Sequence, residues 1–200
     1  YSVRKARGRR DYMNKLVAVV GMSGSGKSIA TDYLEGKGWT KLYFGGITYK
    51  LMAEAGIERT PDGKSEKEFR ENLRREHGPE CYAKFLEPDI REALEKGNVV
   101  LDGLYSWYEY KYLIERFPEL KLICVVVDKE LRYKRVGSRI ERPFSREDII
   151  YRDVAEIENL AKGGPIAYAD YFLFNNGSLE NYKKRLIEIL EDIEKQEGDK

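Results

Sequence analysis

The residues with the clearest chemical pattern lie in "GMSGSGKS", residues 21–28, directly after the apolar run "LVAVV". Gly21, Gly26, Lys27 and Ser28 fit G-x-x-x-x-G-K-[ST] between a predicted strand and a predicted helix, as a phosphate-binding loop requires. Glycines let backbone N–H groups approach phosphate oxygens, the lysine supplies a charge to the β- and γ-phosphates, and the serine hydroxyl ligates Mg²⁺. We therefore expect a bound nucleoside triphosphate, contacted by Gly21, Ser23, Gly24, Ser25, Gly26, Lys27, Ser28 and Ile29.

Asp102 ends a second apolar run, "NVVLDG". A carboxylate at the end of a neighbouring strand can hold Mg²⁺, or one of its waters, beside Ser28. Asp102 is therefore predicted to be both a metal-site residue and a catalytic residue. The alternative is an aspartate that only makes the turn out of the strand, because Asp-Gly is a common turn pair.

Three arginines occur in "KRVGSRIERPFS", at Arg135, Arg139 and Arg142. They stand in and after a predicted helix that leads into a Pro-containing loop, so a lid at about residues 139–150 could close over the nucleotide. Guanidinium groups there can neutralise charge on a phosphoryl group during transfer, which makes Arg139 a predicted catalytic residue. The alternative is a solvated helix face with surface ion pairs.

The segment between the second and third predicted strands, about residues 45–96, is expected to bind the phosphate acceptor. Its basic candidates are Arg70, Arg74, Arg75, His77 and Arg91. Arg74 and Arg91 are preferred for their helical placement, because a bound monophosphate favours bidentate guanidinium groups. Ordinary surface arginines remain the alternative, and His77 could equally serve a turn or a helix cap.

The stretch "DGLYSWYEYKYL" is unusually aromatic. Tyr105 and Trp107 follow Asp102 closely, so either ring could stack on an acceptor base. Packing against the rest of the protein is the alternative for both. Tyr108 and Tyr112 are one helical turn apart and are expected to pack.

Apolar runs and helical periods alternate along the chain, which predicts a parallel sheet covered on both faces. The expected strands are 16–20, 40–44, 98–102, 120–128 and 170–175. The expected helices are 28–36, 47–55, 64–96, 107–116, 129–140, 145–162 and 178–195. Ser145 with Asp148 three residues later, and the polar stretch "NNGSLEN", are expected to cap two of these helices.

Length and composition predict one domain from residue 13 onward, preceded by a basic arm at residues 1–12. Of 36 basic and 35 acidic residues overall, the body from Met13 keeps 31 and 34, a net charge of −3 that argues against general nucleic-acid binding. The arm is either a remnant or an upstream extension, which lacks the apolar periodicity needed to pack, or it contacts RNA or another polyanion.

Because the sequence has no long apolar run, we expect a soluble, cytoplasmic protein with no membrane contact. Cys81 and Cys124 are expected to be packing residues, and the oligomeric state is left open.

From Met13 onward, these motifs resemble the small P-loop kinases of the dephospho-CoA kinase and adenylate kinase branch, and especially an archaeal family of nucleotide-kinase-like proteins. "RVGSR" is similar to the start of the adenylate kinase lid, which implies that Arg135 packs on the ATP base and Arg139 reaches the phosphates. "ADYFLFNNGSLENYKKRL" resembles a C-terminal segment of dephospho-CoA kinases whose loop lies near the adenine, which places Asn175, Asn176 and Gly177 there. The resemblance implies a P-loop NTPase fold in three layers, with a five-stranded parallel sheet in order 2-3-1-4-5, a lid and an acceptor-binding helical region.

The chain departs from that resemblance after the second strand, where it reads "FGGITYKL". Dephospho-CoA kinases carry an Asp there that is proposed to activate the acceptor hydroxyl, whereas this chain has Gly46. Either the acceptor is already ionised, as a nucleoside monophosphate is, or Asp102 serves as the base. Gly46 and Thr48 are the predicted acceptor-side positions in this segment.

Together these features predict ATP·Mg²⁺-dependent phosphoryl transfer to a nucleotide-like acceptor, by positioning and charge neutralisation. AMP, CMP, dTMP and dephospho-CoA all remain open as acceptors. A nucleotide-binding switch or ATPase read by a protein or RNA partner is the alternative, motivated by Gly46 and the basic arm. A binding module without turnover is less favoured because Lys27, Ser28 and Asp102 are all present.

Overall fold

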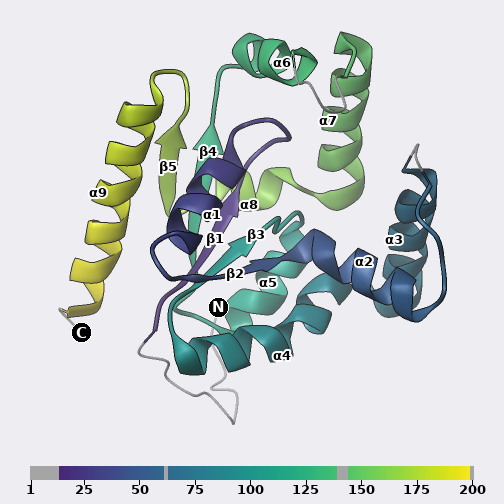
Figure 1. The fold of residues 1–200 in the computed structure, drawn as a ribbon, viewed down its shortest axis with the longest axis horizontal. Coiled ribbons are helices and arrows are strands. Elements are labelled where there is room, and N and C mark those ends of the chain that lie inside the picture. Colours follow the sequence, from purple (N-terminus) through teal and green to yellow (C-terminus); the bar gives the residue numbers. More distant parts are fainter. Residues whose placement is uncertain (1–13, 61–62, 139–143, 199–200) are drawn as a thin grey trace.

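Five parallel strands form the centre of the structure, a computed structural model that describes residues 14–60, 63–138 and 144–198. The strands are β1 (Leu16–Val20), β2 (Thr40–Tyr43), β3 (Val99–Asp102), β4 (Lys121–Val126) and β5 (Tyr171–Phe174). Their order across the sheet is β2-β3-β1-β4-β5, which confirms the expected parallel sheet and its order (Figure 1). All five strands start and end within two residues of the positions expected from the sequence.

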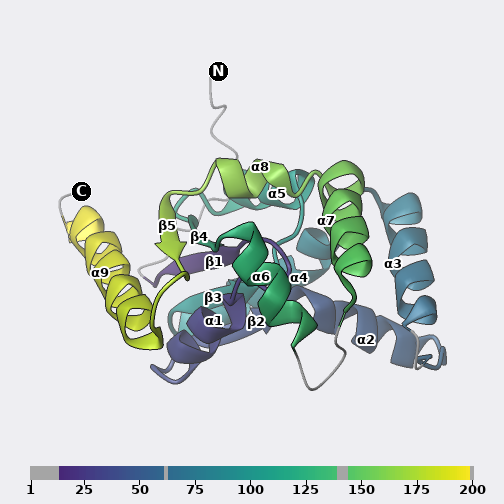
Figure 2. The same cartoon turned by 90° about the horizontal axis from the view of Figure 1, so that it is seen from above.

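Helices connect these strands and cover both faces of the sheet. They are α1 (Lys27–Glu35), α2 (Phe44–Glu54), α3 (Lys64–His77), α4 (Cys81–Lys96), α5 (Trp107–Arg116), α6 (Lys129–Gly137), α7 (Arg146–Leu160), α8 (Gly163–Ala167) and α9 (Leu179–Gly198). Seen from above, α5 and α8 lie on one side of the sheet and α1 on the other, with α9 beyond β5 (Figure 2). The three-layer arrangement predicted from the sequence is therefore present.

The central strand β1 is buried along its whole length, because both of its faces are covered. Leu16, Ala18 and Val20 pack with side chains of α4 and α5. Val17 and Val19 pack with side chains of α1 and α9. A strand enclosed on both sides reads as a continuous apolar run, which is why "LVAVV" shows no alternation with polar residues.

Two of the connections differ from the sequence expectation. The long helical segment expected at 64–96 is divided into α3 and α4, because Gly78 adopts a left-handed φ of 92° that ends α3. The short helix α8 was not expected. Its sequence "GGPIA" combines two glycines and a proline, which do not produce a helical period.

Side-chain caps fix where several helices begin. Ser145 and Asp148 form the predicted capping box at the start of α7. Ser178 accepts from the backbone N–H of Asn181 at the start of α9, as its polar stretch predicted. Ser106 and Glu109 form a second capping box at the start of α5, which the sequence reading did not include.

The register of the parallel strands brings their carboxyl ends to one edge of the sheet. Val19 pairs with Asp102, and Val20 pairs with Cys124. Asp102 is also opposite Tyr43, the last residue of β2. The loop after β1 therefore emerges beside Asp102, and ligand sites of open parallel sheets lie at this edge.

Some sequence predictions concern residues 1–12, Arg139, Arg142 and the first part of the proposed lid, residues 139–143, which lie outside the described residues. The rest of that lid, from residue 144 to residue 150, leads into the first turns of α7. Among the helices that the structure describes, none combines the length and apolar character needed to span a lipid bilayer. Cys81 and Cys124 are both buried free cysteines, as expected for packing residues.

Candidate active site

The loop between β1 and α1 is shaped by glycines in the left-handed region. Gly21, Gly24 and Gly26 have φ values of 140°, 82° and 100°. A Cβ atom at Gly21 would lie 2.4 Å from the carbonyl oxygen of Val125, and one at Gly26 would lie 2.3 Å from the amide nitrogen of Asn175. The loop thus requires glycine for conformation and for space, and it forms the backbone cradle that a phosphate group fits.

Lys27 is the first residue of α1, and its side chain turns back over this loop. Its Nζ donates to the carbonyl oxygens of Gly21 and Met22, each at 3.0 Å. Burial, and after it the positive charge of Lys162, lowers the pKa of Lys27 to about 7. A cation is therefore held at the loop at a considerable desolvation cost, which a bound polyphosphate would offset.

Asp102 lies beside this loop at the end of β3. Its Oδ2 is 3.5 Å from the Thr31 hydroxyl, which also donates to the carbonyl of Ser28, so the carboxylate is linked to the first turn of α1. Burial raises the pKa of Asp102, and the positive charge of Lys27 opposes that rise. Thr31 was not among the predicted residues, because a threonine inside a helix gives no distinctive sequence signal.

The residues near the loop fit Mg²⁺ held together with a nucleotide rather than a cage of protein ligands. Within the described ranges, no group of three or more His, Cys, Asp or Glu side chains could hold a metal ion. Mg²⁺ commonly keeps its waters and binds one or two protein oxygens plus substrate phosphates. Ser28 and Asp102 are the side chains that would supply those oxygens here.

The loop after β5 packs against the glycine loop. The Asn175 amide donates to the carbonyl of Ser25 at 2.8 Å, and its own backbone carbonyl accepts from Arg135 at 2.6 Å. The Tyr182 hydroxyl donates to the carbonyl of Gly26 at 3.0 Å. The structure thus brings Arg135 to the loop that the resemblance placed near the adenine.

Asn176, the residue predicted to bind the nucleotide in that loop, lies beside this contact. Its side-chain oxygen accepts from the backbone N–H of Asp128 at 2.8 Å, which ties the loop after β5 to the start of α6. The neighbouring Asn175 is the one whose side chain contacts the glycine loop, and Tyr182 was missed altogether. The asparagine pair in the sequence gives no sign of which amide faces which neighbour.

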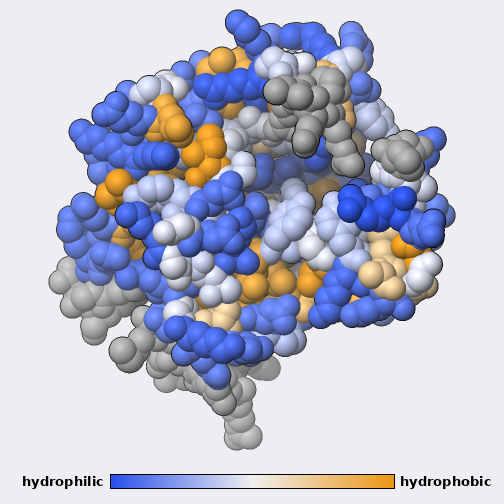
Figure 3. All heavy atoms as spheres, in the orientation of Figure 1, coloured by the Kyte–Doolittle hydropathy of each residue, from blue (hydrophilic) through white to orange (hydrophobic). Residues whose placement is uncertain are grey.

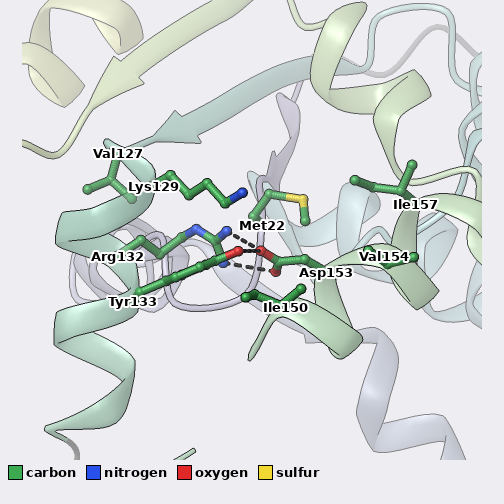
Figure 4. Close-up of a pocket in the computed structure, with 9 residues that line it drawn as sticks. All are labelled: Met22, Val127, Lys129, Arg132, Tyr133, Ile150, Asp153, Val154 and Ile157. Atoms are coloured by element: carbon green, nitrogen blue, oxygen red, sulfur yellow. Dashed lines mark hydrogen bonds and ion pairs between the residues drawn. The ribbon is translucent and has the colours of Figure 1, made fainter. Parts of the chain in front are cut away.

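A pocket of about 400 Å³ opens between the glycine loop and the helices α6 and α7. It is lined by Met22, Val127, Lys129, Arg132, Tyr133, Ile150, Asp153, Val154 and Ile157 (Figure 4). In the space-filling view, this face of the molecule is hollowed below the helices α6 and α7 (Figure 3). The pocket places an apolar wall next to the predicted phosphate site.

Arg132 anchors this pocket to the glycine loop. Its guanidinium donates to the carbonyl of Ser23 at 2.9 Å. It also forms a buried ion pair with Asp153 of α7, which accepts a further hydrogen bond from the Tyr133 hydroxyl (Figure 4). α6 and α7 are therefore joined to each other and to the loop by one arginine. Arg132 was not predicted, because in the basic run before residue 139 it looks like any other charged helix residue.

Arg74, one of the predicted acceptor residues, is held between α4 and α5. Its guanidinium lies 4.9 Å from the centre of the Tyr82 ring, and its Nη2 is 3.9 Å from Oε1 of the fully buried Glu109. The side chain is only 18% exposed, and its buried Nε has no hydrogen-bond partner. A buried donor without a partner is costly, so this guanidinium is suited to receive an anionic group.

Thr48 and Gly46 lie on α2, next to this arginine region. The Thr48 hydroxyl is buried and hydrogen-bonded to the Tyr82 hydroxyl at 2.9 Å, so it joins α2 to α4. Gly46 lies in the first turn of α2, where an added Cβ would meet only Tyr43, at an ordinary 3.7 Å. The backbone thus leaves room for a Cβ atom at Gly46, where the resemblance led us to expect an aspartate.

The structure does not bring Arg91 to this site. Its guanidinium is paired with Glu87 and lies 4.9 Å from the ring of Phe117, which follows α5. α4 runs from the Arg74 region back towards the start of β3, so its later turns lie near the opposite edge of the sheet. The helical pattern showed that both arginines are on helices, but it did not show which end of the sheet each one reaches.

The two aromatic candidates after Asp102 have different environments. Trp107 stacks on Tyr110 and meets the edge of Tyr168, and an added Cβ at Gly164 would lie 2.8 Å from it, so its ring packs against α8. Tyr105 remains beside the site: burial raises the pKa of its hydroxyl, and Lys162 Nζ lies 5.0 Å from the centre of its ring. Trp107 therefore packs within the protein, which was the alternative to stacking on an acceptor base.

The sheet order and the glycine loop after β1 define a P-loop kinase-like fold. A family model described as an AAA domain matches residues 17–158. A "UPF0200 protein" of the archaeon Thermococcus gammatolerans is 36% identical over 183 residues, which cover 89% of this chain and 95% of that protein. The chain belongs to the AAA domain family and to the family of these UPF0200 proteins.

Solved structures share the fold at low sequence identity. A dephospho-CoA kinase from Campylobacter jejuni aligns over 90% of this chain and 98% of its own, with a TM-score of 0.56 and 19% identity. A shikimate kinase from Bacteroides thetaiotaomicron aligns over the same shares, with a TM-score of 0.56 and 13% identity. The resemblance to small kinases is thus confirmed for the fold, and the particular branch stays a prediction.

Proposed function

We propose that this protein transfers the γ-phosphoryl group of ATP, bound with Mg²⁺, to a nucleotide-like acceptor. The observation that carries the proposal is that the glycine loop with Lys27 and the carboxylate of Asp102 emerge side by side at one edge of the sheet. On the donor side, Arg135 and the loop after β5 would bind the nucleotide base, which is supported by the hydrogen bond from Arg135 to the carbonyl of Asn175 in that loop.

The chemistry requires little more than positioning. An acceptor oxygen forms a bond to the γ-phosphorus while the bond from that phosphorus to the β–γ bridging oxygen breaks, and ADP leaves with the bond's electron pair. When bound, Mg²⁺ would offset charge on the β- and γ-phosphate oxygens. Lys27 supplies a further positive charge, and the backbone N–H groups of the loop orient the phosphates.

The proton balance depends on the acceptor. A phosphate oxygen of a nucleoside monophosphate is already ionised and releases no proton. A hydroxyl acceptor, as in dephospho-CoA, gives its proton to Asp102, whose burial-raised pKa makes the carboxylate a stronger base. Arg74, with its unpartnered Nε, favours an acceptor that carries a phosphate group.

The test is ADP release from ATP·Mg²⁺ with AMP, CMP, dTMP and dephospho-CoA as separate acceptors. One acceptor should raise turnover well above the acceptor-free rate, and the Lys27→Ala variant should abolish that increase. Direct detection of the phosphorylated acceptor by mass spectrometry would separate transfer from stimulated hydrolysis. If ATP binds but no acceptor raises turnover, the kinase proposal fails.

That negative outcome would favour a nucleotide-binding switch or ATPase. The observation behind this second candidate is Gly46, where the backbone would accept a Cβ atom but the chain has no carboxylate. Slow ATP hydrolysis that RNA stimulates only when residues 1–12 are present would support this reading.

A further inference from the structure

A buried ion pair that the sequence reading did not identify lies in the connection after α7. Lys162 is only 2% exposed, and its Nζ donates to Oε2 of Glu156. The other carboxylate oxygen of Glu156 accepts from Nε of Arg152 at 3.0 Å. One carboxylate thus orients two cations, of which Lys162 is the buried one and Arg152 is partly exposed.

The backbone fixes where Lys162 lies. The preceding residue, Ala161, has φ 50° and ψ 38°, and among the described residues it is the only non-glycine with a positive φ. This conformation disfavours an L-residue by about 1 kcal/mol, so the surrounding packing must enforce it. Two residues after Lys162, Gly164 packs directly against Trp107 of α5. The loop that carries Lys162 is therefore held from both sides.

The side chain of Lys162 lies next to the candidate active site. Its Nζ is 5.0 Å from the centre of the Tyr105 ring, in the loop that follows Asp102. Lys162 also stands first among the charged neighbours that lower the pKa of Lys27. Two buried ammonium groups, one from the glycine loop and one from the α7–α8 connection, thus repel each other, and an anion bound beside both would remove that repulsion.

We propose that Lys162 contacts the terminal phosphate of the bound nucleoside triphosphate and neutralises charge on it during transfer, with Glu156 as the residue that positions it. This inference rests on the proposed function. Lys27 approaches the phosphates from the glycine loop, whereas Lys162 approaches from the side of Tyr105. The two lysines would therefore lie on two sides of the transferred phosphoryl group. Lys162 would be a second cation there, one that the loop motif does not supply.

A purely structural role does not require these residue types. A buried ion pair is often replaceable by apolar residues of similar volume without loss of stability, because desolvation offsets most of the attraction. Removing one partner alone leaves an uncompensated buried charge and destabilises the fold. The experiment must therefore separate the loss of the Lys162 charge at the ligand from the loss of the buried partner of Glu156, which would keep only Arg152.

The first measurement compares the affinities of Lys162→Met and wild-type protein for ATP·Mg²⁺ and for ADP·Mg²⁺. We expect ATP binding to weaken about tenfold and ADP binding to change less than twofold, because only ATP has the terminal phosphate. Turnover with the acceptor found above should fall about 100-fold, the loss typical of one removed stabilising group. Lys96→Met, which breaks an exposed pair with Glu92 on α4, is the control and should change none of these values.

The second measurement uses the double variant Glu156→Gln/Lys162→Met, which removes both buried charges. We expect it to unfold at the wild-type temperature or above, and still to show the weak ATP binding and low turnover of the single variant. Wild-type turnover in the double variant, or equal losses of ATP and ADP binding in the single one, would overturn the role of Lys162. If the wild-type protein transfers to no acceptor, the proposed function fails, while the contrast between ATP and ADP affinity still decides whether Lys162 contacts the terminal phosphate.

Discussion

The glycine loop after β1 and the acceptor region of α2, α3 and α4 are built in different ways. The loop is formed by eight consecutive residues, and its shape depends on backbone conformation: three glycines in the left-handed region and a lysine bonded to loop carbonyls. In the acceptor region, Arg74 of α3 meets Tyr82 of α4 and Glu109 of α5, residues up to 35 positions apart. One site is a local motif, whereas the other exists only after three helices have packed.

This difference has a functional consequence. A loop of backbone N–H groups recognises phosphates whatever they are attached to, so it specifies the donor only coarsely. Side chains from separate helices recognise one acceptor, and they can change without disturbing the sheet.

Lys27→Ala should reduce phosphoryl transfer by about 10³-fold or more, because the donor phosphates lose the charge that the loop places beside them. The fold should survive, since the variant removes a buried cation whose pKa burial lowers to about 7. Steady-state ADP release and thermal unfolding measure the two effects. Transfer within tenfold of wild type would remove the central role of the loop.

Arg74→Lys should raise the KM for the acceptor by about 10- to 100-fold and leave ATP affinity unchanged, because a lysine cannot replace a bidentate guanidinium. The lysine keeps a positive charge near the buried Glu109, which limits the effect on folding. Arg91→Lys is the matched control and should leave KM unchanged, since Arg91 pairs with Glu87. Equal effects of the two substitutions would contradict the placement of the acceptor.

ATP affinity should depend on pH through Lys27, whose pKa in the protein is about 7. Above that pH the side chain is increasingly neutral, so binding must take up a proton, and affinity should fall by up to about tenfold per pH unit between pH 7.5 and 9. Below pH 7 this dependence should disappear. Calorimetry in buffers of different ionisation enthalpy would detect the proton uptake, and a Lys27→Arg variant, charged throughout, should show none.

Gly46→Asp should stabilise the protein by about 1 kcal/mol, because it replaces a helical glycine and adds a negative charge in the first turn of α2. The expected rise in Tm is about 2 to 4 °C. Transfer to a nucleoside monophosphate should stay within about twofold, because that acceptor needs no base. A large increase confined to dephospho-CoA would show that the acceptor is a hydroxyl and that the missing carboxylate limits the rate.

The sheet and the donor loop could both be predicted from the sequence alone. Short apolar runs between helical periods are enough to specify parallel strands, and the strand order agreed with the one that the resemblance to small P-loop kinases implied. The loop was readable because its residues are consecutive and because only glycine tolerates its conformation and close contacts. The position of Asp102 beside the loop could also be predicted, because parallel strands have their carboxyl ends at the same edge of the sheet.

Which other side chains reach that edge depends on how the helices pack, and this could not be predicted from the sequence. Packing directs Arg74 towards Glu109 and Arg91 away from it, although both are arginines on predicted helices. Packing also brings Lys162 near Lys27, which is 135 positions earlier in the chain. The strained backbone of the preceding residue, Ala161, fixes the position of Lys162. Helical periodicity reports which residues share a face, whereas the position of that face depends on how separate helices pack, and no short stretch of sequence encodes that packing.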